Sequence, residues 1–121
     1  MELIKLEKFT DSRGDLYVLE DELKFKIQRI FYIINGQKIR GKHGHYKTTL
    51  VIICLNGSVT IELHKPGLNK SITLNNPGVG CIIKPGIWHS LKMFSKNSVV
   101  ICLASTKYDQ KDYFYDQEDS F

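Results

Sequence analysis

Short apolar runs separated by turn sequences are the feature that most constrains the fold of this chain. The runs are rich in Val, Ile and Thr, and Asn-Gly or Pro-Gly follows several of them. β-branched side chains favour the pleated surface of a sheet, and Gly and Pro supply the turns between strands. The expected strands are 27–34, 50–55, 58–63, 70–74, 80–85 and 98–104.

Two of these runs predict a hairpin. LVIICL (50–55) and SVTIEL (58–63) flank Asn56-Gly57, which suits a tight two-residue turn. We therefore expect these two strands to pair with each other. Helical periodicity of useful length is absent from the sequence, and LEDELKF (19–25) is expected to form one helical turn at most.

Many short strands at even spacing favour a sandwich or a barrel. With 121 residues the chain is long enough for one domain and too short for two. The run at 50–55 is apolar on both faces, which indicates burial inside a closed structure or between subunits. We expect a single all-β domain over 1–121, whose acidic and aromatic tail, 105–121, packs on the barrel or on a partner subunit.

Cysteine use and charge limit the location and the partners. Three widely spaced cysteines lie in apolar runs, as expected for reduced, buried thiols of a cytoplasmic protein. No apolar run approaches the ~18 residues that a membrane span needs, so no membrane partner is expected. The net charge of +4 suits a mildly basic surface or an anionic ligand such as a nucleotide. The lysines are scattered, which argues against nucleic-acid binding.

The stretch RGKHGHYK (40–47) carries the chemistry. In a strand, His43 and His45 point to the same face, because residues i and i+2 share a face. His89 follows a Pro-Gly turn, and a strand beginning there would bring it near the pair. An imidazole with a pKa near ~6.5 serves as an acid or base at neutral pH and also as a metal ligand. Catalysis, metal binding and a purely structural role are the three alternatives.

The histidine spacing resembles the two signatures of the cupin barrel. The matching positions are His43, His45, Leu50, Gly57, Pro85, Gly86 and His89. Metal-binding cupins have glutamate where this chain has Leu50, which cannot ligate a metal. A three-histidine metal site remains an alternative, but we favour histidines that act without metal or cofactor.

Two histidines on one face suit enolisation beside a carbonyl group. One imidazole takes a proton from carbon and a proton is returned to the adjacent carbon. Tyr32, in the apolar run IFYII, is a candidate to donate its hydroxyl to the enolate oxygen. The alternative is that Tyr32 is a half-buried strand residue whose hydroxyl faces water.

Six motifs in order make the chain similar to a specific family of small cupins. It resembles the nucleotide-sugar 3,4-ketoisomerases of bacterial surface-polysaccharide pathways. The motifs are DSRG (11–14), RIFYI (29–33), RGKHGHYK (40–47), CLNGSV (54–59), PGIWHSL (85–91) and LASTKYDQKDYFYDQEDSF (103–121).

The resemblance implies an isomerase that moves the keto group of dTDP-4-keto-6-deoxyglucose from C4 to C3, in the synthesis of dTDP-3-amino-3,6-dideoxy sugars. It implies a cupin-type (RmlC-like) antiparallel barrel or jelly roll, and a homodimer whose barrels exchange N-terminal strand contacts. It also implies roles for six residues: His43 and His45 as the acid/base pair, Tyr32 beside the sugar, Arg13 and Arg40 on the anionic nucleotide, and His89 in the pocket wall. Guanidinium groups suit a diphosphate because they bind it with two hydrogen bonds.

The chain departs from the family pattern at a few positions. Leu50 stands where the family usually has glutamine, Lys42 replaces an apolar or aromatic residue, and Gly44 replaces alanine, which is expected to loosen the strand. Phe31 replaces a tyrosine and Gln110 an acidic residue.

Several functions remain open at this point. The Leu50 change favours the alternative of a sugar-nucleotide-binding cupin without catalysis. A related 3,5-epimerase is a further alternative, although its histidine and aspartate pattern is not found here. The base among the histidines, the C4 configuration of the product and the exact nucleotide are left unassigned by the sequence.

Overall fold

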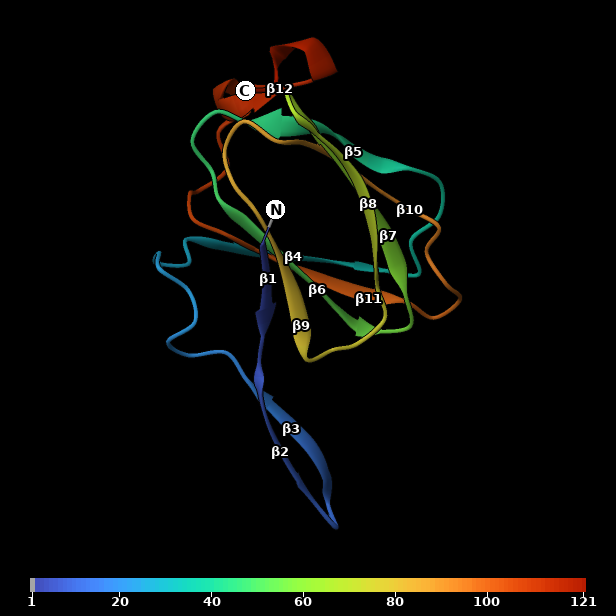
Figure 1. The fold of residues 1–121 in the computed structure, drawn as a ribbon. Coiled ribbons are helices and arrows are strands. Elements are labelled where there is room, and N and C mark those ends of the chain that lie inside the picture. The colour runs from blue at the N-terminus through green and yellow to red at the C-terminus, as the bar shows by residue number, and fades with distance from the viewer. Residues whose placement is uncertain (1) are drawn as a thin grey trace.

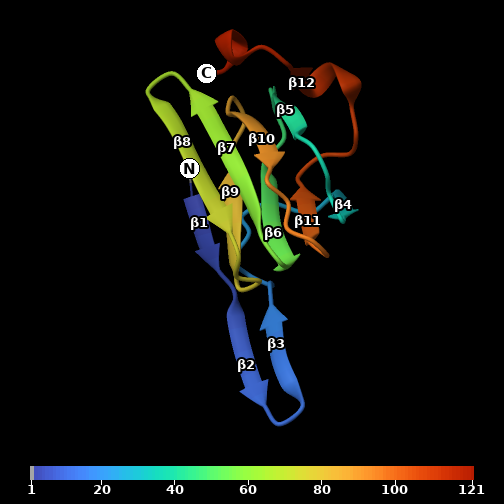
Figure 2. The ribbon, with the colours of Figure 1, turned by 90° about the vertical axis from the view of Figure 1, so that its right-hand side faces the viewer.

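Two five-stranded sheets face each other and enclose the core in the computed structural model, which describes residues 2–121 (Figures 1 and 2). Every strand pair is antiparallel. The first sheet has the order β1-β9-β6-β11-β4, and the second has the order β12-β5-β10-β7-β8. The strands are β1 (Glu2–Lys5), β2 (Glu7–Asp11), β3 (Gly14–Val18), β4 (Arg29–Ile34), β5 (Arg40–His45), β6 (Leu50–Asn56), β7 (Val59–Lys65), β8 (Leu68–Leu74), β9 (Val79–Ile83), β10 (Trp88–Lys92), β11 (Val99–Ala104) and β12 (Tyr113–Phe114).

The predicted all-β class and the six predicted strands are confirmed. They correspond to β4, β6, β7, β8, β9 and β11. Residues 19–25 form bends and no helix. The helices found within residues 2–121 are two short 3₁₀ turns, η1 (Gln110–Asp112) and η2 (Gln117–Asp119). Neither of them is long and apolar enough to cross a membrane.

Strand β6 is apolar on both faces because it separates two clusters of buried side chains. Ile52 and Cys54 belong to the main core between the sheets, with Ile61 of the opposite sheet. Val51 and Ile53 point to the other face, where a second cluster includes partly buried residues of the segment 19–25. All three cysteines are free and buried, as the sequence predicted.

The hairpin predicted between 50–55 and 58–63 is wrong. Strand β6 pairs with β9 and β11, whereas β7 pairs with β8 and β10. The Asn56-Gly57 turn therefore carries the chain from one sheet to the other. Gly57 has left-handed backbone, with φ of 78°. This conformation fits a connection between two sheets, which we call the arch, as well as it fits a hairpin. The Asn56 side-chain amide donates to the carbonyl of Asn97 at 2.8 Å and holds the arch to the loop before β11.

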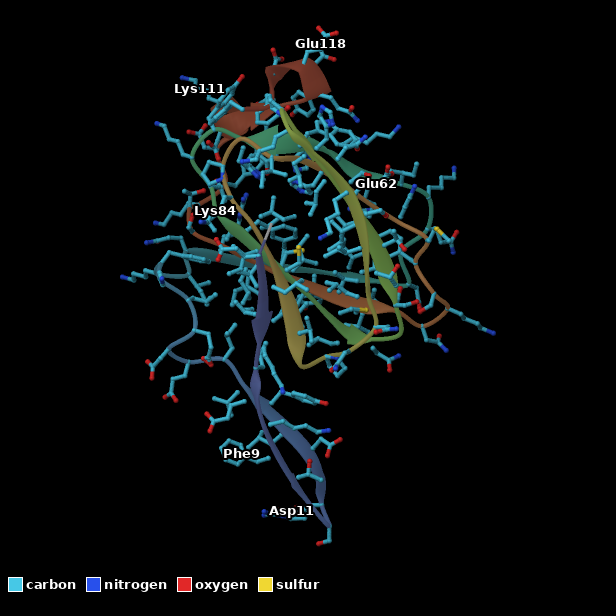
Figure 3. The ribbon with its side chains drawn as sticks, in the orientation of Figure 1. Phe9, Asp11, Glu62, Lys84, Lys111 and Glu118 are labelled. Atoms are coloured by element: carbon cyan, nitrogen blue, oxygen red, sulfur yellow. The ribbon has the colours of Figure 1, made fainter. Side chains whose placement is uncertain are left out.

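Strands β2 and β3 form a hairpin that extends away from the barrel, as the labelled Phe9 and Asp11 show (Figure 3). These strands pair only with each other within residues 2–121. Phe9 lies opposite Leu16, and their side chains are 52% and 61% exposed. The hairpin thus presents apolar side chains that the barrel of the same chain does not cover.

The tail packs on the barrel rather than extending from it. Strand β12 pairs with β5, with Tyr113 opposite His45. The buried carboxylate of Asp112 accepts hydrogen bonds from the Lys47 amide at 2.7 Å and from the Thr48 hydroxyl. These two bonds fix the tail to the segment that directly follows β5.

Two further bonds close the end of the tail over the barrel. The Trp88 indole donates to the carbonyl of Tyr115 at 2.9 Å, and the Phe121 amide donates to the carbonyl of Gly86 at 2.9 Å. The labelled Lys111 and Glu118 mark this layer above the mouth of the barrel (Figure 3). Residues 110–121 therefore pack over one end of the barrel.

Gly44 makes room for the tail beside β5. A Cβ atom at Gly44 would collide with the ring of Phe114 and lie 2.7 Å from the carbonyl oxygen of Ile87. We therefore expect Gly44→Ala, which restores the residue usual in the resembled family, to lower the free energy of unfolding by about 1–3 kcal/mol, the usual cost of overpacking. Denaturant unfolding measures this loss.

A second substitution, Phe114→Ile, tests the cause of this loss, because isoleucine is smaller than phenylalanine and has no ring. The double variant Gly44→Ala/Phe114→Ile is expected to lose less than the sum of the two single variants, because the clash with the ring disappears while the 2.7 Å approach to the carbonyl oxygen of Ile87 remains. Additive losses in the double variant would contradict the account.

Candidate active site

Three histidines meet in one wall of the barrel. Strand β5 carries His43 and His45, and the neighbouring strand β10 places His89 directly opposite His43. The ring centroid of His43 lies 5.1 Å from that of His45 and 4.9 Å from that of His89. The centroids of His45 and His89 are 5.9 Å apart. The i, i+2 spacing and the antiparallel register together make this cluster.

The cluster opens into a cavity of about 310 Å³ between the two sheets. Its polar wall consists of Tyr32, Arg40, His43, His45, His89 and Tyr113. The apolar wall consists of Phe31, Ile33, Leu50, Ile52, Leu91 and Cys102, together with Gly41. A larger open groove, of about 750 Å³, lies at the base of the β2–β3 hairpin, but it is lined mainly by charged side chains and contains no histidine.

Burial keeps all three imidazoles in the uncharged form at neutral pH. Burial, together with the smaller effect of the neighbouring His43, lowers the pKa of His89 to about 3 and that of His45 to about 4. Burial also lowers the pKa of His43. Near pH 7 the cluster therefore consists of uncharged imidazoles, each with one nitrogen free to accept a proton.

The three rings differ in access to the cavity. His45 and His89 are buried, and their Nε2 and Nδ1 atoms, respectively, have no hydrogen-bond partner among residues 2–121. His43 is partly exposed and contacts both other rings. It is therefore the imidazole that a ligand in the cavity reaches first.

The side chain of Leu50 occupies the place that the cupin signature gives to a metal-binding carboxylate. It is buried and belongs to both the cavity wall and the main core. Among residues 2–121, no group of three or more His, Cys, Asp and Glu side chains is arranged to hold a metal ion. The donor set consists of neutral imidazoles without a carboxylate.

The structure brings five of the six residues singled out in the sequence to this cavity. Tyr32, on β4, contributes to the rim, but it lies opposite Ile101 of the second cluster, so its side chain, with 65% of the residue exposed, points to the outer face of the sheet. Arg40 lies at the start of β5. Arg13 is not among them. It lies at the tip of the β2–β3 hairpin, where its guanidinium is bound to the carboxylate of Asp11.

Tyr113 is a cavity residue that the sequence reasoning missed. Its ring centroid lies 4.7 Å from that of His43 and 4.6 Å from that of His45. The tail was expected to pack on the barrel, but the run DYFY gave no sign of which aromatic ring would enter the site. The pairing of β12 with β5 decides this, because Tyr113 lies opposite an inward-facing histidine.

Comparisons with known proteins agree on one family. The family model "FdtA: WxcM-like, C-terminal" matches residues 1–121. The chain is 39% identical over 123 residues to the TDP-4-oxo-6-deoxy-alpha-D-glucose-3,4-oxoisomerase of Aneurinibacillus thermoaerophilus, and the match covers 98% of this chain and 88% of that protein.

Solved structures agree with this match. A double mutant of the 3,4-ketoisomerase QdtA from Thermoanaerobacterium thermosaccharolyticum, in complex with TDP, is 40% identical with a TM-score of 0.93, covering 97% of this chain and 88% of that one. A histidine-to-asparagine mutant of the same enzyme, in complex with TDP-4-keto-6-deoxyglucose, is 38% identical with a TM-score of 0.92, at the same coverage.

The RmlC epimerase of Mycobacterium tuberculosis is 20% identical with a TM-score of 0.81, covering 93% of this chain and 66% of that one, and it shares the fold. The expected RmlC-like cupin barrel is thereby confirmed.

The lowered histidine pKa values predict acid-sensitive stability. Between pH 6.5 and about 4 the unfolded chain binds protons that folded His45 does not, so its contribution is fully present above pH 6.5 and is lost as the pH falls through about 4. Each histidine that stays unprotonated contributes a slope of up to about 1.4 kcal/mol per pH unit. Denaturant unfolding at several pH values measures the slope, and we expect a shallower slope for His45→Gln. An equal slope in both proteins would contradict burial as the cause.

Proposed function

Since the chain belongs to the FdtA, WxcM-like C-terminal family, we propose that it is a sugar-nucleotide 3,4-ketoisomerase. Its substrate would be dTDP-4-keto-6-deoxyglucose, and its product a 3-keto sugar used to make dTDP-3-amino-3,6-dideoxy sugars. The observation that carries the proposal is the cluster of uncharged histidines in the wall of a cavity. Relatives at about 40% identity over nearly the whole chain have this activity in their names.

The chemistry is an enolisation that leaves the composition of the sugar unchanged. A neutral imidazole takes the proton from C3, the electrons of that C–H bond form the C3=C4 double bond, and the C4 carbonyl oxygen takes up a proton, which makes an enediol. The C3 hydroxyl then gives up its proton as its oxygen forms the ketone, and C4 receives a proton from the protonated imidazole. The two protons released at C3 and its oxygen are thus matched by the two gained at C4 and its oxygen. Two adjacent imidazoles suit this sequence because one can accept a proton while the other donates one.

We assign the base to His43 and the second acid/base role to His45. His43 is partly exposed to the cavity and is held in its basic form by the lowered pKa. His45 lies 5.1 Å from it, between centroids, and is more buried. His89, which is the most deeply buried of the three, lines the pocket behind them.

Arginine side chains are proposed to bind the anionic part of the substrate. Arg40 lies in the cavity wall, where its guanidinium suits a diphosphate. No role beside the sugar is proposed for the Tyr32 hydroxyl, because the side chain points to the outer face of β4, opposite Ile101. No cofactor is required by this chemistry, and the free, buried cysteines support a cytoplasmic location.

A homodimer would explain both the position of Arg13 and the apolar surfaces left uncovered. Strand β4 pairs with β11 on one side only, which leaves a sheet edge beside the exposed side chains of Ile30 and Ile34. The projecting β2–β3 hairpin offers matching strands with exposed apolar side chains. We propose that two copies exchange these N-terminal contacts, which would carry Arg13 to the nucleotide bound by the partner.

Replacement of either acid/base histidine is expected to reduce turnover without unfolding the protein. His43→Asn and His45→Asn should each lower kcat by about 10²–10⁴-fold, the usual scale for losing general acid/base catalysis. Proton NMR of dTDP-4-keto-6-deoxyglucose in D2O with chelator-treated protein measures exchange at C3 and the new 3-keto species. His64→Asn is the matched control, because His64 lies on β7 outside the cavity wall.

The outcomes of the NMR experiment separate the alternatives. Wild-type turnover by both histidine variants would refute the acid/base assignment. Tight TDP binding by the wild-type protein without any C3 exchange would favour a binding protein, and exchange that returns only with added metal would favour a three-histidine metal site.

The proposed dimer can be tested by substitutions on the β2–β3 hairpin. Charges placed on the apolar hairpin in Phe9→Asp/Leu16→Asp should convert the dimer to a monomer, because both side chains would be buried against the second copy. Sedimentation or light scattering measures the mass. A wild-type protein that is already monomeric at tens of micromolar would contradict the exchange.

A further inference from the structure

Strand β5 contains an extra residue at Lys42. In the ladder with β10, His43 lies opposite His89, Gly41 opposite Ser90 and Arg40 opposite Leu91. Lys42 has no partner in this register. Both Gly41 and Lys42 have left-handed backbone, with φ of 83° and 58°. Together they form a β-bulge in the strand that carries the histidines.

The bulge decides which side chains of β5 enter the cavity. In a regular strand, residues three apart point to opposite faces, so Arg40 would point away from the side that His43 occupies. The structure instead has both in the cavity wall. The extra residue at position 42 shifts the alternation by one and reverses every position that precedes it.

The neighbouring strand confirms the faces independently. His89 and Leu91 line the cavity, while the hydroxyl of Ser90 donates at 3.2 Å to the carboxylate of Glu62 on the other face. Residues opposite each other in an antiparallel ladder share a face. Arg40, which lies opposite Leu91, therefore faces the cavity, whereas Gly41, which lies opposite Ser90, reaches the cavity wall with its backbone alone.

We propose that Lys42 is a positioning residue for anion binding: its left-handed backbone places the Arg40 guanidinium in the cavity that the catalytic histidines line. The identity of the anion as the diphosphate of a nucleotide rests on the proposed function, whereas the register does not. Lys42 acts through its backbone, so its own charge is not required for the effect.

The competing register is well defined. If residue 42 took ordinary extended backbone, it would lie opposite Ser90, Gly41 would lie opposite Leu91, and Arg40 would turn outward. A β-branched residue strongly disfavours the left-handed region, so Lys42→Val should favour this alternative. Deletion of Lys42 should keep the observed register. Without residue 42, His43, Gly41 and Arg40 can pair with His89, Ser90 and Leu91 as in a regular ladder.

The test is the affinity for thymidine diphosphate, measured by calorimetry. Lys42→Val should weaken binding by about tenfold or more, as expected for the loss of charged hydrogen bonds to phosphate. The deletion of Lys42 should retain the affinity within about threefold. Lys38→Val is the matched control, because Lys38 also has left-handed backbone, with φ of 61°, but lies outside the β5 ladder and the cavity wall.

A double-variant cycle separates register from general damage. Arg40→Ala should weaken binding in the wild-type background and have little further effect in Lys42→Val, since Arg40 has then already left the cavity. Wild-type affinity in folded Lys42→Val, or additive losses in the cycle, would overturn the proposal. A folded deletion variant that binds as weakly as Arg40→Ala would overturn it as well, and this outcome decides the question if Lys42→Val does not fold.

Failure of the proposed function would be recognised separately. If the wild-type protein does not bind thymidine diphosphate, a crystal structure of the deletion variant gives the answer on register. Arg40 opposite Leu91 in that structure supports the proposal, and Arg40 turned to the outer face overturns it. Intact binding without isomerisation would refute the catalytic function and leave the role of Lys42 in place.

Discussion

The pairing of β5 with β10 is the interaction on which the rest of the site depends. It sets His43 against His89, fixes the faces of Arg40 and Leu91, and leaves a free edge of β5 to which the tail adds β12. The imidazoles are uncharged because this pairing buries them, and burial is the main cause of their lowered pKa values. One ladder thus determines the position, the protonation and the aromatic surroundings of the proposed catalytic groups.

Much of this arrangement was predictable from the sequence. Strand positions followed from the apolar runs, and the i, i+2 spacing predicted that His43 and His45 share a face. The motif order also led to the correct family. The pairing of strands 50–55 and 58–63 was predicted wrongly, because an Asn-Gly turn specifies a backbone conformation and not the sheet that the next strand joins. The apolar character of β6 on both faces, with two clusters to fill, places it in the middle of one sheet.

Other features lay beyond local reasoning because they depend on contacts distant in the sequence. A lysine has no local preference for left-handed backbone, so the bulge at Lys42 is visible only in the ladder. Tyr113 also depends on a distant contact, because it enters the site through the pairing of β12 with β5. The role of Gly44 depends on Phe114, whose ring occupies the space beside the glycine. The small residue at position 44 of the strand therefore leaves the space that the ring of Phe114 in the tail occupies.

The arch at Asn56-Gly57 also has a consequence for how the protein folds. Since β6 does not pair with the strand that follows it, its hydrogen bonds can form only when β9 and β11 are present, and β11 ends at Ala104. Strand β5 likewise needs β10 as its partner on one side and β12 on the other. Domains dominated by such non-local pairings fold slowly. During synthesis, the sheet that holds the histidines can be completed only after β12 has left the ribosome, so the site is among the last parts of the barrel to form.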